Sequence, residues 1–404
     1  MKSSDWRTTS FTTAGSVTEP VHAETRSPWP LLPAALTALV ALSFLGFGFL
    51  HPALNFDLIP YATLAKEMRG AGGKDEVYRE LAAKMGPARF ENAVSAPYEK
   101  KMHEDDAFFA ANLPFYEIRP LYIFLCSAAG LLIENDAVAT YAVSAIAAAL
   151  AVLVSYAIVR MIRIPAGPWR LAAPLSWIVA GGLPIAALST PDAVAALVGL
   201  LFVQAWLAEH RTGGRAIWLI LLAGLIVAAR TDAILFAAPL LLGEALLDPR
   251  RRAVALVALA AAAVTYAVIQ KTTGNYGYIA ILNFTMIDGP QKLLVPDLVP
   301  HPLGYVRAVA GGILQILSDG NGGIFLLAAS FLALVSVREW RLRRAPDGNA
   351  FDRRILILAC GLIFFLIAHF VLFPLPTARF FLGPYVLAGL LFARAAQRDF
   401  ASRR

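Results

Sequence analysis

The run LLPAALTALVALSFLGFGFL, residues 31–50, decides the fold class of this chain. It carries no charged side chain and is about as long as a helix that crosses the hydrocarbon core of a bilayer. It begins too far from the N-terminus, and is too long, for a cleaved signal peptide, so it predicts a signal anchor. Polar sequence then begins with NFDLIPYATLAKEM, residues 55–68, which places Asp57 just beyond the predicted membrane helix. A carboxylate at that position needs an explanation.

Composition extends this prediction to the whole chain. Of the 404 residues, 58% are hydrophobic and 16% are charged, whereas soluble domains have about 25% charged residues. Because a spanning segment must satisfy its own backbone hydrogen bonds, we predict an all-α, polytopic integral membrane protein surrounded by membrane lipids. The net charge of +7 fits the excess of Lys and Arg in cytoplasmic loops. No basic stretch is interleaved with aromatic residues, so no nucleic-acid partner is expected.

The hydropathy pattern predicts about 11–12 apolar segments. The clearest are residues 31–50, 119–134, 137–161, 171–189, 193–208, 215–230, 233–247, 252–270, 322–337, 354–373 and 379–396. Residues 1–30 are polar and predict a disordered cytoplasmic tail, and residues 31–400 predict one transmembrane domain. Two polar stretches, 51–117 and 271–321, are predicted as outer loops of this domain, with an amphipathic piece at 75–85.

Basic clusters indicate which loops face the cytoplasm. They lie at residues 159–170, 208–215, 248–252 and 338–344 and in the C-terminal tail. Assigning them to the cytoplasm puts both polar stretches, and the turns 189–192, 229–232 and 373–379, on the outer side. Segment 119–134 conflicts with this assignment, because it lies between an outer loop and a helix that must begin outside. It is either a re-entrant or shallow element, or a full span that changes the topology upstream of Arg160.

Charged side chains gather on the predicted outer side, several of them at the ends of apolar segments. They are Asp57, Asp192, Arg230, Asp232, His301, Arg307 and Arg379. Ionisable residues at membrane depth are costly and commonly functional, although each taken alone can also cap a helix or lie in water. Arginines beside a carboxylate suit a site that binds phosphate and uses the carboxylate as a base.

Several stretches together resemble a known family. Asp57, Tyr61-Ala62 and Glu67-Met68 form a D-x-x-x-Y-A-x-x-x-x-E-M pattern after the first helix. It resembles the membrane glycosyltransferases of the GT-C superfamily, and in particular the branch of lipid A aminoarabinose transferase and protein O-mannosyltransferase. Similar stretches follow in the same order: YEIRPLYIFL (116–125), ALSTPDAVAALVGLLF (187–202), AARTDAILFAAPLLL (228–242) and FPLPTARFFLGPYVLAG (373–389). The resemblance covers residues 31–395.

The resemblance implies a GT-C-like helical bundle and a sugar transfer on the periplasmic or outer side of a bacterial inner membrane. Asp57 would be the catalytic base that takes a proton from a glycan, lipid or protein acceptor. The donor would be a sugar on a polyprenyl phosphate, whose phosphate Arg230 and Arg379 would bind. Arginine suits this role because its planar fork grips two oxygens at once.

Further residues are assigned more loosely. Arg119, Lys271 and Arg307 are additional candidates for phosphate binding, and Tyr61 is either a sugar contact or a packed interfacial tyrosine. Asp192 either binds sugar hydroxyls or, with Thr190 and Pro191, begins a helix as its cap.

The chain also departs from the family pattern. Many relatives carry two adjacent acids in the first loop, but Leu58 follows Asp57, so neither a metal nor another cofactor is expected. HEDD, residues 103–106, is a weak metal motif and is interpreted as a solvated charge run. Relatives with a soluble C-terminal domain can select acceptors there. In this chain we expect 51–117 and 271–321 to do so.

Two other classes of function stay open. A multi-spanning transporter or flippase of a lipid-linked or anionic substrate would also be basic, but weak internal symmetry is expected of it and none is visible. A non-catalytic assembly protein would not need the ordered Asp and Arg positions. Among the remaining residues, His301 is a weak catalytic candidate. His369, Cys126 and Cys360 are expected to be packed inside spans.

Overall fold

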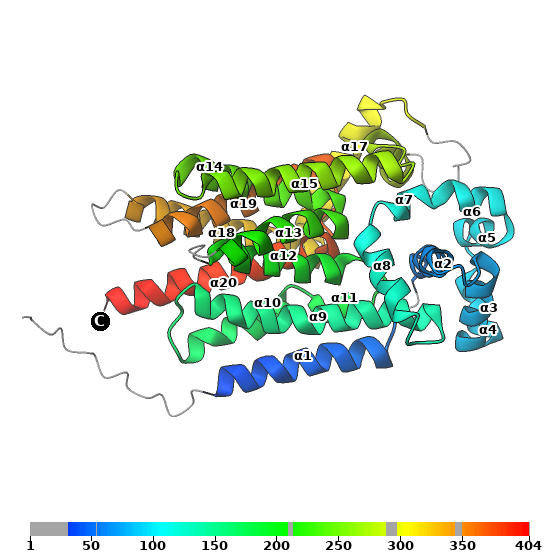
Figure 1. The fold of residues 1–404 in the computed structure, drawn as a ribbon, viewed down its shortest axis with the longest axis horizontal. Helices are drawn as coiled ribbons and strands as arrows, with labels where there is room; N and C mark the ends of the chain where they lie inside the picture. Colours follow the sequence, from blue (N-terminus) through cyan, green and yellow to red (C-terminus); the bar gives the residue numbers. More distant parts are fainter. Residues whose placement is uncertain (1–30, 54, 209–212, 288–296, 344–349, 404) are drawn as a thin grey trace, which may run out of the picture.

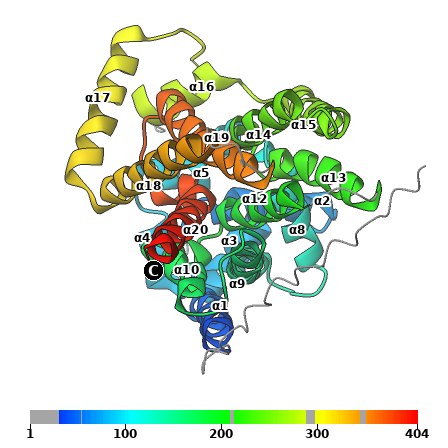
Figure 2. The same ribbon diagram turned by 90° about the vertical axis from the view of Figure 1, so that its left-hand side faces the viewer.

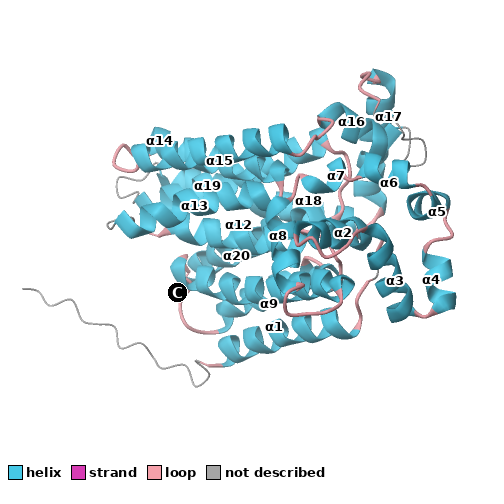
Figure 3. Ribbon diagram, turned by 45° about the vertical axis from the view of Figure 1, so that its right-hand side comes forward, coloured by secondary structure: helices cyan, strands magenta, loops and turns pink. Residues whose placement is uncertain are grey.

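The computed structural model describes residues 31–403, except residues 54, 209–212, 288–296 and 344–349. The predicted cytoplasmic tail, 1–30, and most of the basic loop 208–215 lie outside this description. The fold is all-α, as predicted (Figure 3). Within the described ranges, the only β pairing is one isolated parallel bridge between Ala53 and Leu188.

Six helices of the described chain are long and apolar enough to cross a membrane. They are α1 (Leu32–Leu50), α9 (Asp136–Met161), α15 (Arg252–Thr272), α18 (Gly320–Arg343), α19 (Ala350–Leu372) and α20 (Ala378–Ser402). They run side by side along the long axis of the molecule and are seen nearly end-on in the perpendicular view (Figures 1 and 2). The chain is therefore a multi-pass membrane protein.

Shorter helices complete the bundle. They are α8 (Pro120–Ala129), α10 (Ala172–Val179), α11 (Gly182–Ala186), α12 (Asp192–Leu207), α13 (Gly213–Ala229) and α14 (Ile234–Leu247), with 3-10 turns η1 (Pro168–Leu171) and η2 (Thr231–Ala233). The ten residues of α8 are about 15 Å long, half the thickness of the hydrocarbon core. Segment 119–134 therefore does not span, and the conflict in the predicted topology disappears.

The predicted segment 171–189 is broken in two at a pair of glycines. Gly181 has a left-handed backbone, with φ of 68°, between α10 and α11. A side chain at Gly182 would collide with the rings of Trp177 and Phe44. The break is therefore set by a backbone conformation that glycine favours, and hydropathy does not detect it.

The first polar stretch folds into a cap of short helices at one end of the bundle, on the right in Figure 1. These are α2 (Leu58–Met68), α3 (Lys74–Met85), α4 (Pro87–Ala93), α5 (Pro97–Glu104), α6 (Asp106–Asn112) and α7 (Pro114–Glu117). They enclose a small core of their own, which includes Leu58, Val77, Met102 and Phe108. The predicted amphipathic piece at 75–85 lies in α3, which buries Val77, Tyr78 and Leu81.

The second polar stretch, 271–321, is more ordered than predicted. It contains α16 (Tyr278–Leu282), the π-helical turn η3 (Asn283–Ile287) and α17 (Pro302–Ser318), which packs beside α18 (Figure 2). Gly312 of α17 lies directly against the Pro374 carbonyl and the Phe370 ring. A side chain at Gly312 would collide with both, so glycine permits this close approach of α17 to the bundle.

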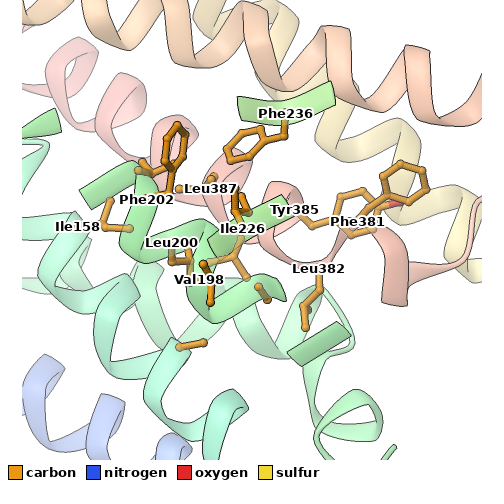
Figure 4. Close-up of a cluster of buried hydrophobic side chains, with 14 of the residues drawn as sticks. Ile158, Val198, Leu200, Phe202, Ile226, Phe236, Phe381, Leu382, Tyr385 and Leu387 are labelled. Atoms are coloured by element: carbon orange, nitrogen blue, oxygen red, sulfur yellow. The ribbon is translucent and has the colours of Figure 1, made fainter. Parts of the chain in front are cut away.

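Apolar side chains of α12, α13, α14 and α20 fill the bundle between its two ends (Figure 4). Phe202, Ile226, Phe236 and Phe381 belong to this core, and each is at most 5% exposed. The end opposite the cap carries buried ion pairs instead, such as Arg394 with Glu339 at 2.7 Å. The C-terminus lies at that end, on the left in Figure 1. Cys126 is buried as predicted, whereas the prediction for Cys360 is wrong, because it is exposed on α19.

Candidate functional site

Asp57 lies where the chain passes from the bundle into the cap. It occupies the position before α2, but its side chain makes no capping hydrogen bond. Instead, Oδ1 accepts a hydrogen bond from the Tyr116 hydroxyl at 3.3 Å, and Oδ2 lies 3.3 Å from Nη1 of Arg379. The side chain is 30% exposed. The carboxylate therefore does not cap its own helix, and part of it is accessible to a ligand.

Two backbone contacts fix this position. The Ala53 N–H donates to the Ala187 carbonyl at 3.0 Å, and the Ser189 N–H donates to Oδ1 of Asn55 at 3.2 Å. These bonds attach the segment after α1 to the loop before α12. Asp57 consequently lies beside the loop that carries Asp192, although 135 positions separate them in sequence.

Arg230 is the centre of a buried ionic cluster. It binds Asp232 through two nitrogens, Nε at 3.0 Å and Nη2 at 2.7 Å, and its Nη1 donates to Asp192. Asp192 in turn accepts from the Thr190 hydroxyl at 2.8 Å, and neither residue caps α12. His369 Nε2 lies 2.9 Å from Asp232 Oδ2. Asp232 is thus an ion-pair partner, and Arg230 is held from both sides.

Arg379 and Arg230 approach the same aromatic ring. Their guanidinium carbons lie 4.9 Å and 4.8 Å from the centroid of Phe380. Such contacts hold a cation without consuming its hydrogen-bond donors. The Arg379 side chain is 36% exposed, whereas that of Arg230 is 11% exposed. Arg379 is therefore the more accessible of the two.

Arg119 differs from both. It precedes α8, is half-buried, and its Nη1 donates to the Phe115 carbonyl. Among the described residues it has no carboxylate partner. An arginine has five N–H donors, so Arg119 keeps most of its donors available to an anion.

Two adjoining cavities bring these side chains together. The first, of about 190 Å³, is lined by Asp57, Tyr61, Phe115, Tyr116, Arg119, Thr190, Pro191, Asp192, Arg230, Ile281, Phe284, Thr285, Phe373, Arg379 and Phe380. The second, of about 350 Å³, has a mostly apolar surface that includes Ile118, Ile234, Leu235, Tyr266, Tyr278 and Leu372, but the polar residues Thr231, Asp232, Gln270, Asn275 and His369 also line it. Arg119, Arg230, Ile281, Phe373 and Phe380 line both. A polar chamber and an apolar chamber therefore share a wall that carries two cations.

Tyr61 is one of the residues that line the polar cavity. It is 2% exposed, and its ring meets those of Tyr116 and Tyr122 edge-on, with centroids 5.2 Å and 4.9 Å apart. Burial raises the pKa of the Tyr61 hydroxyl well above its usual value. The hydroxyl thus keeps its proton at neutral pH and can donate a hydrogen bond to a ligand.

Some candidates lie elsewhere. Lys271 and Arg307 are exposed and line neither cavity, and His301 pairs with Asp297 at 2.6 Å. In the HEDD motif, Asp105 caps α6 and Asp106 pairs with Lys74. Across the described ranges, no group of three or more His, Cys, Asp or Glu side chains is arranged to hold a metal ion.

Three residues of the site were not identified from the sequence as ligand contacts. Tyr116 opens the stretch YEIRPLYIFL, yet nothing in its neighbours points to Asp57. Asp232 was named only as one of the charged side chains on the predicted outer side, and His369 was expected only to pack. His369 is buried and hydrogen-bonded as expected, but it also lines the apolar cavity. The contacts of Tyr116 with Asp57 and of His369 with Asp232 join segments far apart in the chain, so local patterns do not reveal them.

Comparison with known proteins gives no further guide. No protein-family description, no curated protein and no solved structure matches the chain. The function is therefore inferred from the geometry of the two cavities and from the chemistry of their linings.

Proposed function

We propose that this protein is a membrane glycosyltransferase that moves a sugar from a polyprenyl-phosphate carrier to an acceptor on the outer side of the membrane, with Asp57 as the catalytic base. One observation carries the proposal. Asp57 and three arginines, brought from four distant parts of the chain, line a polar cavity that shares a wall with a larger apolar cavity. A donor with a sugar phosphate at one end and an isoprenoid chain at the other would need a polar cavity beside an apolar one.

The two cavities suit the parts of such a donor. The sugar fits the polar chamber, within reach of Tyr61 and Asp57. The first isoprene units fit the apolar chamber, beside Leu235 and Leu372. The phosphate then falls at the shared wall, where Arg119 offers unpaired donors, with Arg379 nearby in the polar chamber. Arg230, bound by two carboxylates, contributes positive charge while its donors stay occupied.

The reaction follows from this placement. The acceptor hydroxyl gives its proton to an Asp57 oxygen as its own oxygen bonds to the anomeric carbon. The bond between that carbon and the phosphate oxygen breaks, and the electron pair leaves on polyprenyl phosphate. Negative charge grows on the leaving phosphate, so Arg119 and Arg379 stabilise the transition state more than the bound donor. Tyr116 orients Asp57 through its hydroxyl.

The proposed location is a bacterial inner membrane, with the cavities on the periplasmic side. The cap, several of whose residues line the polar cavity, lies at one end of the bundle, and the C-terminus lies at the other (Figure 1). Loops rich in Lys and Arg stay in the cytoplasm, which leaves the cap outside.

The test is transfer from purified protein in lipid vesicles. A panel of polyprenyl-phosphate sugars, each labelled in the sugar, is offered with a mixture of membrane glycan, lipid and protein acceptors, and released polyprenyl phosphate is measured. Release together with a labelled acceptor supports the proposal. Movement of intact donor across the bilayer without bond cleavage would instead identify a flippase, and neither result with any donor would remove the proposal.

A further inference from the structure

A further apolar groove lies between α10 and α18, away from the two cavities of the candidate site. Its volume is about 340 Å³. Both helices pack on α20, which forms the floor of the groove and lies between them in Figure 2. None of the described residues that line this groove lines the polar or the apolar cavity. The proposed sugar transfer therefore leaves the groove without a role.

The rims of the groove are apolar and exposed. Leu175 and Val179 of α10 are 53% and 55% exposed, and Leu327 of α18 is 41% exposed. Because α18 and α20 are long and apolar enough to cross a membrane, rims between them face hydrocarbon and not water. The groove is thus continuous with the lipid-facing surface of the bundle, and a lipid chain is the occupant that its surroundings supply.

The floor of the groove is buried and lined by small residues. Ala388 is 1% exposed, and a side chain at the neighbouring Gly389 would collide with the Ser176 hydroxyl of α10. The floor runs from Tyr385 to Ala393, and eight steps along a helix are about 12 Å. This length is close to the hydrocarbon depth of one leaflet. The groove therefore fits one acyl chain that lies along α20.

One end of the groove is aromatic and lies on the side of the C-terminus. The Phe331 and Phe392 rings stack there, with centroids 4.0 Å apart. Trp169 also lines this end, and its ring centroid lies 6.5 Å from that of Phe400 near the end of α20. Tryptophan is enriched where a membrane meets water. The groove thus ends at the membrane surface opposite the cap, where a lipid carries its headgroup.

Two arginines flank this end in the loop between α9 and α10. Arg170 stands in the chain between two residues that line the groove, and its Nε donates to the Ile164 carbonyl at 3.2 Å. The guanidinium carbon of Arg163 lies 4.5 Å from the centroid of the Phe351 ring. Among the described residues, neither arginine pairs with a carboxylate. Both therefore keep N–H donors and an uncompensated charge at the membrane surface.

Acidic side chains at the same end of the bundle are already bound by other arginines. Glu339 and Asp352 pair with Arg394 at 2.7 Å and 2.5 Å, and Asp399 pairs with Arg338 at 2.8 Å. These acids do not neutralise the loop arginines. Each Arg near a membrane surface favours an anionic lipid by roughly fivefold. The charge at this end of the groove therefore selects an anionic headgroup.

We propose that the groove binds one acyl chain of an anionic phospholipid from the leaflet opposite the cap, with the lipid phosphate beside Arg163 and Arg170. In the proposed orientation this is the cytoplasmic leaflet. The bound chain touches α10, α18 and α20 together, so it stabilises their packing in the folded protein. The site is separate from the proposed sugar transfer and does not depend on it.

The experiment is photo-crosslinking of the full chain in phosphatidylcholine vesicles. The probe is phosphatidylglycerol with a diazirine in one acyl chain, and the crosslinked residues are identified by mass spectrometry. We expect crosslinks within 168–180, 324–331 and 385–393. Unlabelled phosphatidylglycerol should displace the probe at a concentration roughly tenfold or more below that of added phosphatidylcholine with the same acyl chains.

Two matched pairs of variants separate the groove from the charge. Val179→Trp fills the groove and should abolish these crosslinks, whereas Ile178→Trp should retain them, because Ile178 is 57% exposed on the same helix but does not line the groove. Arg163→Gln combined with Arg170→Gln should keep the crosslinks and lose the preference for phosphatidylglycerol. Arg89→Gln in the exposed cap should keep both. Variants are compared as monodisperse preparations, so that misfolding is not mistaken for loss of the site.

Three results would overturn the proposal. The first is displacement of the probe by phosphatidylcholine as well as by phosphatidylglycerol. The second is crosslinking within the groove that Val179→Trp leaves unchanged, or no crosslinking there at all. The third is displacement by a polyprenyl phosphate at lower concentration than by phosphatidylglycerol, which would assign the groove to an isoprenoid carrier.

Discussion

Three arginines share the site, but they have different partners and therefore different roles. Arg230 is bound by Asp192 and Asp232, and without it the buried Asp192 carboxylate would keep only the Thr190 hydroxyl as a partner. Arg119 has a backbone carbonyl as its partner and faces both cavities. At the scale of single residues, Arg230 is thus needed mainly for the fold of the site, and Arg119 is needed mainly for the ligand.

This difference predicts opposite effects of two matched substitutions. Arg230→Gln should destabilise the protein by about 3–5 kcal/mol, because it removes the cation that pairs with the buried Asp192 and the partly exposed Asp232. Arg119→Gln should change stability by less than about 1 kcal/mol, while raising KM for the donor about tenfold or more. Unfolding in detergent and initial transfer rates measure the two effects. The reverse order of stabilities would contradict the roles assigned here.

Some of these site residues could be predicted from the sequence alone. Asp57, Arg230 and Arg379 follow or precede apolar segments on one side of the membrane, and the structure gathers them around one cavity. Lys271 and Arg307 satisfy the same pattern but are exposed. The pattern predicts the side of the membrane, but it does not predict the direction of a side chain around its helix. Tyr116 and His369 could not be predicted in this way, because each is identified as a site residue only by its contact with a residue distant in sequence.

At the scale of elements, an ionic network attaches the cap to the bundle. Lys66 of α2 binds Glu80 of α3 at 2.6 Å and Asp136 of α9 at 3.0 Å, and Arg69 also binds Asp136. Asp136 is 1% exposed and Lys66 is 8% exposed. The network therefore holds α2, which follows Asp57, against the start of α9.

Asp136→Asn should loosen this attachment. It removes the partner of two buried cations, so we expect a loss of about 3 kcal/mol and faster proteolysis within 70–113. Burial alone would lower the pKa of Lys66, but its bonds to Glu80 and Asp136 outweigh burial and raise the pKa above its usual value. The stabilisation from Lys66 is thus present at neutral pH and is lost only as the pH rises past the raised pKa, above about pH 10.5. We therefore expect the wild type to be cleaved at equal rates at about pH 7 and about pH 9. Cleavage that accelerates across that range would contradict the raised pKa of Lys66.

The break between α10 and α11 makes a second prediction for an element. Gly181→Ala should cost about 1–2 kcal/mol, because the left-handed backbone, and not crowding, is what disfavours a side chain there. Gly46→Ala in α1 is the matched control, since it also has open space but lies in ordinary helix. It should be neutral or slightly stabilising. Equal effects of the two changes on the unfolding midpoint would show that the turn is not strained by a side chain.

Element boundaries were predictable where hydropathy sets them and not where packing does. The apolar pattern located α1, α9 and α19, whose lengths match the bilayer. It missed α17, which is held by contact of Gly312 with α19 and the turn after it, and it joined α10 to α11 across two glycines. Hydropathy left segment 119–134 as either a shallow element or a full span, and the ten-residue helix α8 favours the shallow element.

At the scale of the whole molecule, the account requires the cap and the C-terminus to lie on opposite sides of the membrane. Asp75→Cys in the cap should react with a membrane-impermeant maleimide added to intact cells. Ser402→Cys at the end of α20 should react only after the cells are opened. The wild type, with Cys126 buried and Cys360 within a spanning helix, supplies the background. Labelling of both positions from one side would remove the proposed topology.

The central claim is that Asp57 is the base of a sugar transfer, and the most direct measurement is turnover of Asp57→Asn with a polyprenyl-phosphate sugar. Asparagine keeps the size and can still accept from Tyr116, but it cannot take a proton. We predict a loss of about 10²- to 10⁴-fold in kcat, with donor binding retained and with the exposed control Asp75→Asn at wild-type activity. Unchanged turnover in Asp57→Asn would contradict the account at its centre.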